Sequence, residues 1–164
     1  MTPPSNITPA TLADLEYVSQ RMRDDEVAQA MAFSGDQVFD AAAHALRLAN
    51  YGPIRYTLVD EDGYPACVAG WYQVTPGVWQ CWMVGTAKAW EKQWQSITKG
   101  CRWLMEELEK LPITRRLQLN ALASREEAIE WYERGLLMQP CGVVQNHGAN
   151  GEAVAFFARE VKRG

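Results

Sequence analysis

The sequence has few of the residues that hold metal ions. Its four cysteines lie far apart, without any Cys-x-x-Cys pair, and it has only two histidines. Because a zinc site needs clustered thiolates or imidazoles, we expect no metal site. The first residues also lack the charged-then-apolar layout of an export signal, so the cysteines are expected to be free thiols in a cytosolic protein.

The sequence also lacks a basic segment. Its formal net charge is −4, its pI is about 5.2, and no cluster of lysines and arginines occurs. Proteins that bind nucleic acids without sequence specificity present a basic face to the phosphates. We therefore expect no nucleic-acid partner.

A long apolar run is missing as well. Residues 63–87 contain no charged side chain, but prolines, glutamines and glycines interrupt them, and their apolar residues alternate with others. A membrane-spanning helix needs roughly 20 consecutive, mostly apolar residues. The segment therefore predicts a buried β-hairpin in a soluble protein without a membrane partner.

What the sequence does contain is a regular succession of strand and helix patterns. With 164 residues, 48% of them hydrophobic, the chain is expected to form one domain over residues 1–164. The predicted strands are 6–8, 54–60, 66–74, 78–84, 116–120, 142–145 and 153–160, and the predicted helices are 11–22, 26–33, 37–50, 90–111 and 124–134. The longest helix follows the fourth strand.

Local signals support these helices. Thr11 with Asp14, and Ser124 with Glu127, have the spacing of capping boxes. Two apolar stripes predict buried helix faces, one with Val38, Ala42, Ala45, Leu46 and Ala49, the other with Trp90, Trp94, Ile97, Cys101, Leu104, Leu108 and Leu111. The tryptophans of the second stripe are interpreted as core residues.

Two segments resemble motifs of the GNAT superfamily of N-acetyltransferases. In "TPATLADLE", Ala10 and Asp14 match the opening strand and helix of that family. In "NALASREEAIEWYERGLL", the matching residues are Asn120, Ala128 and Trp131-Tyr132-Glu133-Arg134. The resemblance implies an α/β (α+β) GNAT-like fold, a mixed and mostly antiparallel sheet of six to seven strands flanked by helices, and acetyl-CoA as the cofactor.

The resemblance also implies roles for particular residues. Tyr132 would be the general acid, because a phenol with a pKa near 10 can protonate the thiolate that leaves acetyl-CoA. The residues implied to contact the cofactor are Met83, Val84, Gly85, Lys88, Lys92 and Asn120. The alternative is that Tyr132 is an ordinary amphipathic aromatic with its hydroxyl at the surface.

The loop before the long helix departs from the family pattern. The family has a Gln/Arg-x-x-Gly-x-Gly/Ala loop whose backbone N–H groups bind the pyrophosphate. Here "VGTAKAWEKQWQ" has one glycine, Gly85, and places Trp90 and Trp94 where small residues are expected. Lys88 and Lys92 remain as cations for phosphate. The fourth strand also lacks the carboxylate that often serves as base.

The resemblance also implies that the segment between the first two helices forms the acceptor side of the cleft, as it does in GNAT proteins. Arg23, Asp25 and Glu26 lie there, and carboxylates would attract a cationic amine. The alternative is a solvated helix start whose acidic first turn complements the helix dipole.

A narrower resemblance is to the GNAT-like small proteins of short-tailed lytic bacteriophages, some of which are internal virion proteins. The shared features are Arg23 followed by Asp24-Asp25-Glu26, Gly63 then Pro65, and Cys81-Trp82. This resemblance implies the host cytoplasm or the virion interior as location, and a host protein or virion-core protein as partner. Two hypotheses follow: an acetyl-CoA-dependent N-acetyltransferase acting on a host protein or small amine, or a non-catalytic GNAT-fold virion component or binder of a host enzyme.

Overall fold

The computed structural model describes residues 4–164. Its elements are β1 (Ile7–Pro9), α1 (Leu12–Ser19), α2 (Asp24–Ser34), α3 (Ala41–Ala49), β2 (Arg55–Val59), β3 (Pro65–Thr75), β4 (Val78–Gly85), α4 (Ala87–Glu109), β5 (Arg116–Leu122), α5 (Glu126–Glu130), the π-helical turn η1 (Trp131–Gly135), β6 (Gln139–Val144) and β7 (Val154–Glu160). Residues 1–3, on which the expected lack of an export signal partly rests, lie outside the described part. Within residues 4–164, every helix is too short or too polar to span a membrane.

The seven strands form one sheet in the order β1-β2-β3-β4-β5-β7-β6. All neighbours are antiparallel except β4 and β5, which are parallel. This confirms the predicted mixed, mostly antiparallel sheet with the long helix after the fourth strand. The uncharged segment is the β3–β4 hairpin, as its alternation predicted.

The parallel pair β4 and β5 separates after a short ladder. Only residues 78–80 of β4 pair with residues 116–118 of β5, so the later residues of the two strands diverge. Backbone groups in such a split have no strand partner across it and are free to meet a ligand. The split lies in the middle of the sheet and is the place where the site forms.

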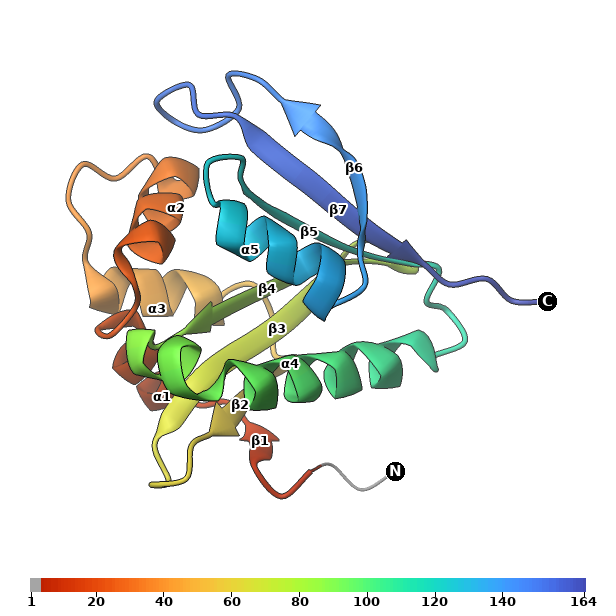
Figure 1. The fold of residues 1–164 in the computed structure, drawn as a ribbon, viewed down its shortest axis with the longest axis horizontal. Coiled ribbons are helices and arrows are strands. Elements are labelled where there is room, and N and C mark those ends of the chain that lie inside the picture. The colour runs from red at the N-terminus through yellow and green to blue at the C-terminus, as the bar shows by residue number, and fades with distance from the viewer. Residues whose placement is uncertain (1–3) are drawn as a thin grey trace.

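Helices cover both faces of the sheet. The larger core lies between α4 and one face, and its fully buried members include Leu58, Ile97, Leu104 and Leu117. A second core lies between α1, α3 and the other face, around Leu15 and the strand residues Val68 and Val84. Figure 1 shows α4 and α5 running side by side across the strands, with α1, α2 and α3 gathered at one end.

The apolar stripe of the long helix is confirmed in its middle and wrong at two positions. Ile97, Cys101, Leu104 and Leu108 are buried, but Trp94 is 49% exposed and Leu111 is 41% exposed. The backbone at Gln93 is not helical (φ −135°, ψ 22°), so the helix is interrupted one residue before Trp94. Leu111 lies beyond the end of α4. The helical spacing therefore predicted a buried stripe that is longer than the one observed.

Two leucines of this stripe give a matched stability test. Leu104→Ala is expected to lower the free energy of unfolding by about 2–5 kcal/mol, because it leaves a cavity in the core. Leu111→Ala is expected to cost less than about 1 kcal/mol, since the residue is already 41% exposed and its truncation leaves no closed cavity. Urea unfolding of both variants measures the difference, and similar losses would contradict the assignment of Leu111 to the surface.

Helix starts are confirmed for α1 and wrong for α3. Thr11 and Asp14 form the predicted reciprocal capping box. Helix α3 begins at Ala41 and not at residue 37, because the Asp40 carboxylate accepts the Ala43 N–H and ends the preceding extended chain. Val38 is consequently 78% exposed, outside the helix it was assigned to.

The predicted cap of the short helix is also wrong. Arg125, not Ser124, holds the N-cap position of α5, and its side chain makes no capping bond. The helix then widens into η1, where the Leu136 N–H donates to the Trp131 carbonyl five residues back. Strand β5 extends two residues past Asn120, which therefore does not end it.

Candidate functional site

Two adjoining cavities lie at the split between β4 and β5, and a groove between α4 and η1 adjoins one of them. The junction cavity, of about 200 Å³, lies beside α5 and η1 and is lined by Arg23, Glu26, Met83, Trp90, Arg125, Tyr132 and four others. The α2–α3 cavity, of about 500 Å³, lies on the other face of the sheet and shares Glu26, Met83, Arg125 and Tyr132 with it. The α4–η1 groove, of about 930 Å³, shares Trp94, Glu127 and Trp131 with the junction cavity. The junction cavity is therefore adjacent to an opening on each face.

Tyr132 is buried in the wall of the junction cavity. It is the second residue of the π-helical turn η1, and its ring packs edge-on against Phe157 at 5.5 Å between centroids. Burial raises the pKa of the Tyr132 phenol above 10, against the opposing effect of Arg125. The phenol is thus protonated at neutral pH and can donate a proton or hydrogen bond. The alternative of an ordinary surface tyrosine is wrong; the role of general acid stays a prediction.

Glu26 is buried although it lies in the first turn of α2. Its Oε1 accepts a hydrogen bond from Trp90 Nε1 at 3.0 Å, and its Oε2 accepts one from the Gly85 N–H at 3.3 Å. Burial raises the pKa of Glu26 from 4.5 to about 7, and the Arg125 guanidinium, 3.9 Å away, opposes this shift. The interpretation of Glu26 as part of a solvated helix start is wrong. Its carboxyl has the pKa expected of a base at neutral pH.

This buried carboxyl makes stability depend on pH. The folded protein holds the Glu26 proton more tightly than the unfolded chain, so the free energy of unfolding falls as pH rises from about 4.5 to about 7. Relative to Glu26→Gln, the wild type is expected to lose up to about 3 kcal/mol between pH 4.5 and pH 8. Urea unfolding at both pH values measures this, with Glu127→Gln, whose side chain is 91% exposed, as control. Parallel pH dependences for wild type and Glu26→Gln would refute it.

Arg125 joins α5 to α2 and was missed by sequence reasoning. Its buried guanidinium donates from Nε to Asp25 Oδ2 at 2.8 Å and from Nη1 to Gln29 Oε1 at 2.8 Å. Burial alone raises the pKa of Asp25. The hydrogen bond from Arg125 and its charge together lower this pKa by more, so the net shift is downward. Asp25 and Arg125 are 100 positions apart in the sequence, and no local pattern marks the arginine as buried.

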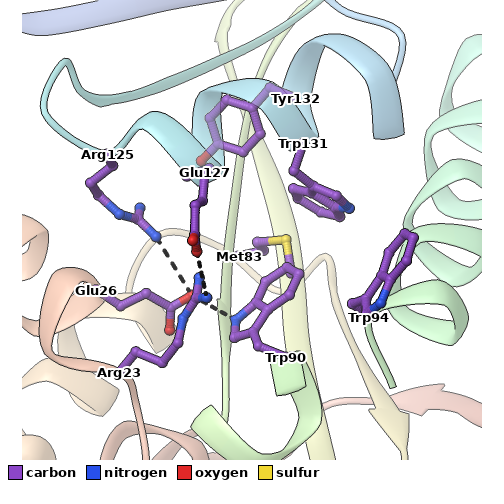
Figure 2. Close-up of a pocket in the computed structure, with 10 residues that line it drawn as sticks. Arg23, Glu26, Met83, Trp90, Trp94, Arg125, Glu127, Trp131 and Tyr132 are labelled. Carbon is purple, nitrogen blue, oxygen red and sulfur yellow. Dashed lines mark hydrogen bonds and ion pairs between the residues drawn. The ribbon is translucent and has the colours of Figure 1, made fainter. Parts of the chain in front are cut away.

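Arg23 lies at the mouth of the junction cavity. Its guanidinium is 5.2 Å from the centroid of the Trp90 ring, and Nη1 is 3.8 Å from Glu127 Oε2. Nε is 3.5 Å from Asp25 Oδ1, a charge contact without hydrogen-bond geometry. Figure 2 shows Arg23 and Glu26 facing the space beneath Tyr132, with Trp90 beside them. Arg23 and Glu26 therefore line the junction cavity together with Tyr132, whereas Asp25 forms ion pairs with Arg23 and Arg125 and does not line that cavity.

Three backbone N–H groups at the start of α4 are bonded within the protein and are not available to a pyrophosphate. The Ala87 N–H donates to the Arg21 carbonyl at 2.8 Å, and the Ala89 N–H donates to Thr86 Oγ1 at 3.1 Å. The Gly85 N–H is bonded to Glu26. The departure from the family loop in the sequence thus corresponds to amides that are already bonded within the protein.

Trp90 fills the space above Gly85, the single glycine of the loop before α4. A Cβ at Gly85 would lie 2.6 Å from Trp90 Nε1, so the indole packs directly on the glycine. The ring also meets Trp131 edge-on, with centroids 5.0 Å apart. Both indoles line the junction cavity.

The six predicted cofactor contacts are dispersed. Met83 lines both cavities, whereas Val84 and Asn120 line only the α2–α3 cavity. Lys88 lies 3.5 Å from Asp62 at the surface, and Lys92 is exposed on α4. Gly85 is buried under Trp90. As cofactor contacts, all six stay predictions.

Metal binding has no candidate site in the described part of the chain. Among residues 4–164, no three His, Cys, Asp or Glu side chains lie close enough together to hold an ion. Cys67, Cys81 and Cys101 are buried free thiols, and Cys141 is an exposed one.

Comparison with known proteins identifies the architecture. No protein-family model matches the sequence, and no curated protein matches it. Solved structures do match: a GNAT-family acetyltransferase from Bacillus anthracis has a TM-score of 0.72 at 13% identity, over 96% of this chain and 95% of that one. The ribosomal-protein-S18-alanine N-acetyltransferase from Escherichia coli has a TM-score of 0.70 at 17% identity, over 96% and 94%.

A third similar structure contains the cofactor of that family. It is a GNAT superfamily phosphinothricin acetyltransferase from Sinorhizobium meliloti in complex with AcCoA, with a TM-score of 0.67 at 16% identity, over 96% of this chain and 89% of that one. At these identities the likeness shows the fold. The chain therefore has a GNAT-like, acetyltransferase-like fold.

Proposed function

We propose that this protein is an acyltransferase that moves an acetyl group from a thioester such as acetyl-CoA to an amine, with Glu26 as general base and Tyr132 as general acid. The observation that carries the proposal is that both residues line both cavities. A donor entering from the α5 face and an amine entering from the α2 face would meet between a base and an acid. A similar structure with AcCoA bound supports the choice of acetyl-CoA as acyl donor.

The chain's own residues would move two protons. Glu26, with a pKa of about 7, accepts a proton from the attacking amine through a carboxylate oxygen. Tyr132 donates the proton of its hydroxyl toward the sulfur that leaves, because its raised pKa keeps it protonated until then. When bound, an acyl thioester supplies the activated carbonyl carbon, whose C–S bond breaks as the C–N bond forms.

The residues present fit one part of the donor and not another. The junction cavity is lined by Met83, Ala128 and Trp131, an apolar wall suited to a thioester arm. At the start of α4, the amides of Gly85, Ala87 and Ala89 are already bonded within the protein. Lys99 and Arg134 instead line the α4–η1 groove, so the phosphates would meet these cations.

Isothermal titration with acetyl-CoA tests the proposal. We expect saturable heat and an upward thermal shift, followed by release of CoA thiol when amines are added. If millimolar acetyl-CoA produces neither heat nor a thermal shift, the proposed enzymatic function is excluded.

Tyr132→Phe separates catalysis from binding. The variant is expected to lower kcat about 10²-fold or more while leaving the Kd for acetyl-CoA nearly unchanged, because only the transferred proton is lost. Stopped-flow or thiol-release assays measure kcat, and titration measures Kd. Tyr64→Phe, whose tyrosine is 54% exposed, is the control. Wild-type turnover in Tyr132→Phe would exclude the phenol from the mechanism.

A second function is favoured by the internal hydrogen bonds of the amides at the start of α4. The bonds of Gly85, Ala87 and Ala89 within the protein suit a GNAT fold that no longer turns over a nucleotide thioester. In that case the protein would be a phage virion-interior component or a binder of a host enzyme, as the resemblance around Arg23 and Cys81-Trp82 implies. Mass spectrometry of purified particles tests the virion role, since absence from mature particles excludes it.

A further inference from the structure

The α2–α3 cavity carries little negative charge. Of its described lining residues only Glu26 is a carboxylic acid, against the guanidinium groups of Arg47 and Arg125. His44 also lines it, and burial lowers the pKa of His44 to about 4, so the ring is neutral at pH 7. A polyamine or an aminated sugar carries several ammonium groups and needs several carboxylates. The cavity therefore suits an acceptor with one amine only.

The walls of this cavity offer hydrogen-bond donors. Gln29 Oε1 accepts from the Leu122 N–H and from Arg125, which leaves its amide NH₂ without a partner among residues 4–164. Asn120 Oδ1 accepts from Gln80 Nε2 at 3.2 Å, and its NH₂ likewise has no bonded group within the described chain. Free NH₂ groups match carbonyl oxygens. The acceptor should thus carry carbonyls beyond its amine.

Three aromatic rings, those of Tyr51, Tyr72 and Trp82, form a cluster in the wall of this cavity. Tyr51 stacks on Tyr72 with centroids 5.3 Å apart and meets Trp82 at 6.4 Å. Trp82 lies directly on Gly70, where a Cβ would be 2.5 Å from the indole. Tyr51 is 40% exposed, so the cluster is accessible. Such rings provide an apolar surface for a side chain next to the reacting amine.

We propose that the acceptor is the α-amine at the N-terminus of a peptide chain. Its amine would reach Glu26, its first carbonyls would accept from Gln29 and Asn120, and one of its first side chains would pack on Tyr51, Tyr72 and Trp82. The proposal rests on the acyltransferase function of the same site. An α-amine is also easier to deprotonate than a lysine, since its ordinary pKa is 7.7–8.0 rather than about 10.4.

Peptide binding tests the proposal without any acyl donor. The probes are a library of tetrapeptide amides with a free N-terminus and an aromatic residue at position one or two, the same library N-acetylated, and spermidine. Nuclear magnetic resonance titration of the tryptophan indole signals should show binding of the free library, at least roughly tenfold weaker binding of the acetylated one, and none of spermidine. No binding of the free library, or equal binding of the acetylated one, would overturn the proposal.

Two variants place the peptide in the α2–α3 cavity. Asn120→Leu and Tyr51→Ala are expected to weaken binding of the free library several-fold, because each removes one proposed contact. Tyr64→Ala is the control on an exposed aromatic elsewhere. Unchanged binding in both cavity variants would contradict the site even if the peptides bind.

Acyl transfer distinguishes this proposal from the function on which it rests. If peptides bind but no acetyl group is transferred, the acceptor site is supported and the acyltransferase function is excluded. If spermidine or the lysine side chains of N-blocked peptides are acetylated and free N-termini are not, the acyltransferase function is supported and the proposed acceptor class is overturned.

Discussion

Glu26→Gln is expected to lower kcat for acyl transfer by about 10²- to 10⁴-fold, the range that a positioned general base contributes. The amide occupies the same space and can still accept one hydrogen bond from Gly85 or Trp90, but it cannot take a proton. Binding of the thioester should change little, since Glu26 acts on the amine. Thiol-release assays with a free-amine peptide and titration of acetyl-CoA measure the two effects.

The pH dependence makes this result specific. Glu26 must be ionised to act as base, so wild-type kcat/KM should rise with pH through an apparent pKa near 7 and then level off. In Glu26→Gln the remaining activity should lack that step. Glu127→Gln is the matched control, because Glu127 lines the same cavity with a 91% exposed side chain. A retained step near pH 7 in Glu26→Gln would assign the base to another group.

Arg125→Met is expected to have the largest effect on stability among the charged residues of the site, about 3 kcal/mol. Removing one partner of a buried ion pair leaves the other charges without compensation. Arg125 is buried and bonded to Asp25 and Gln29, and it faces Glu26. Asp25 is 43% exposed and partly hydrated, which places the loss near the lower end of the range for buried pairs.

Urea unfolding of Arg125→Met and of Arg134→Met measures this contribution. Arg134 pairs with Glu130 at 2.9 Å on the surface of α5 and η1, with side chains 82% and 60% exposed. Such an exposed pair contributes at most about 0.5 kcal/mol. Equal losses in the two variants would mean that the Arg125 contacts do not hold α2 against α5. The Arg125 variant should also raise the pKa of the activity step, because a cation near Glu26 is gone.

Local sequence signals predicted the fold well. The order of strands and helices follows from alternation, from helical spacing and from caps such as Thr11 with Asp14, all of which act within a few residues. They failed where a competing local signal or a backbone break intervened. Asp40 capped α3 later than the apolar pattern suggested, and the break at Gln93 moved Trp94 to the surface.

The site was predicted less completely than the fold. Tyr132 was identified through the family motif, and Glu26 was placed on the substrate side, but neither burial nor a shared cavity was visible in the sequence. Arg125 was missed because an arginine beside two glutamates looks like a solvated helix start. The bonded amides at the α4 start required the loop around Arg21 to be located in space.

By itself, the sequence determined the succession of elements, the lack of a Lys/Arg cluster along the chain and the presence of a single glycine before α4, since each depends on residue type and short spacing. Only the tertiary structure decided that Glu26, Arg125 and Tyr132 meet at the split between β4 and β5. Contacts across 100 positions depend on the packing of α2 against α5, and the pKa values depend on burial. Neither quantity is a property of any short stretch of the chain.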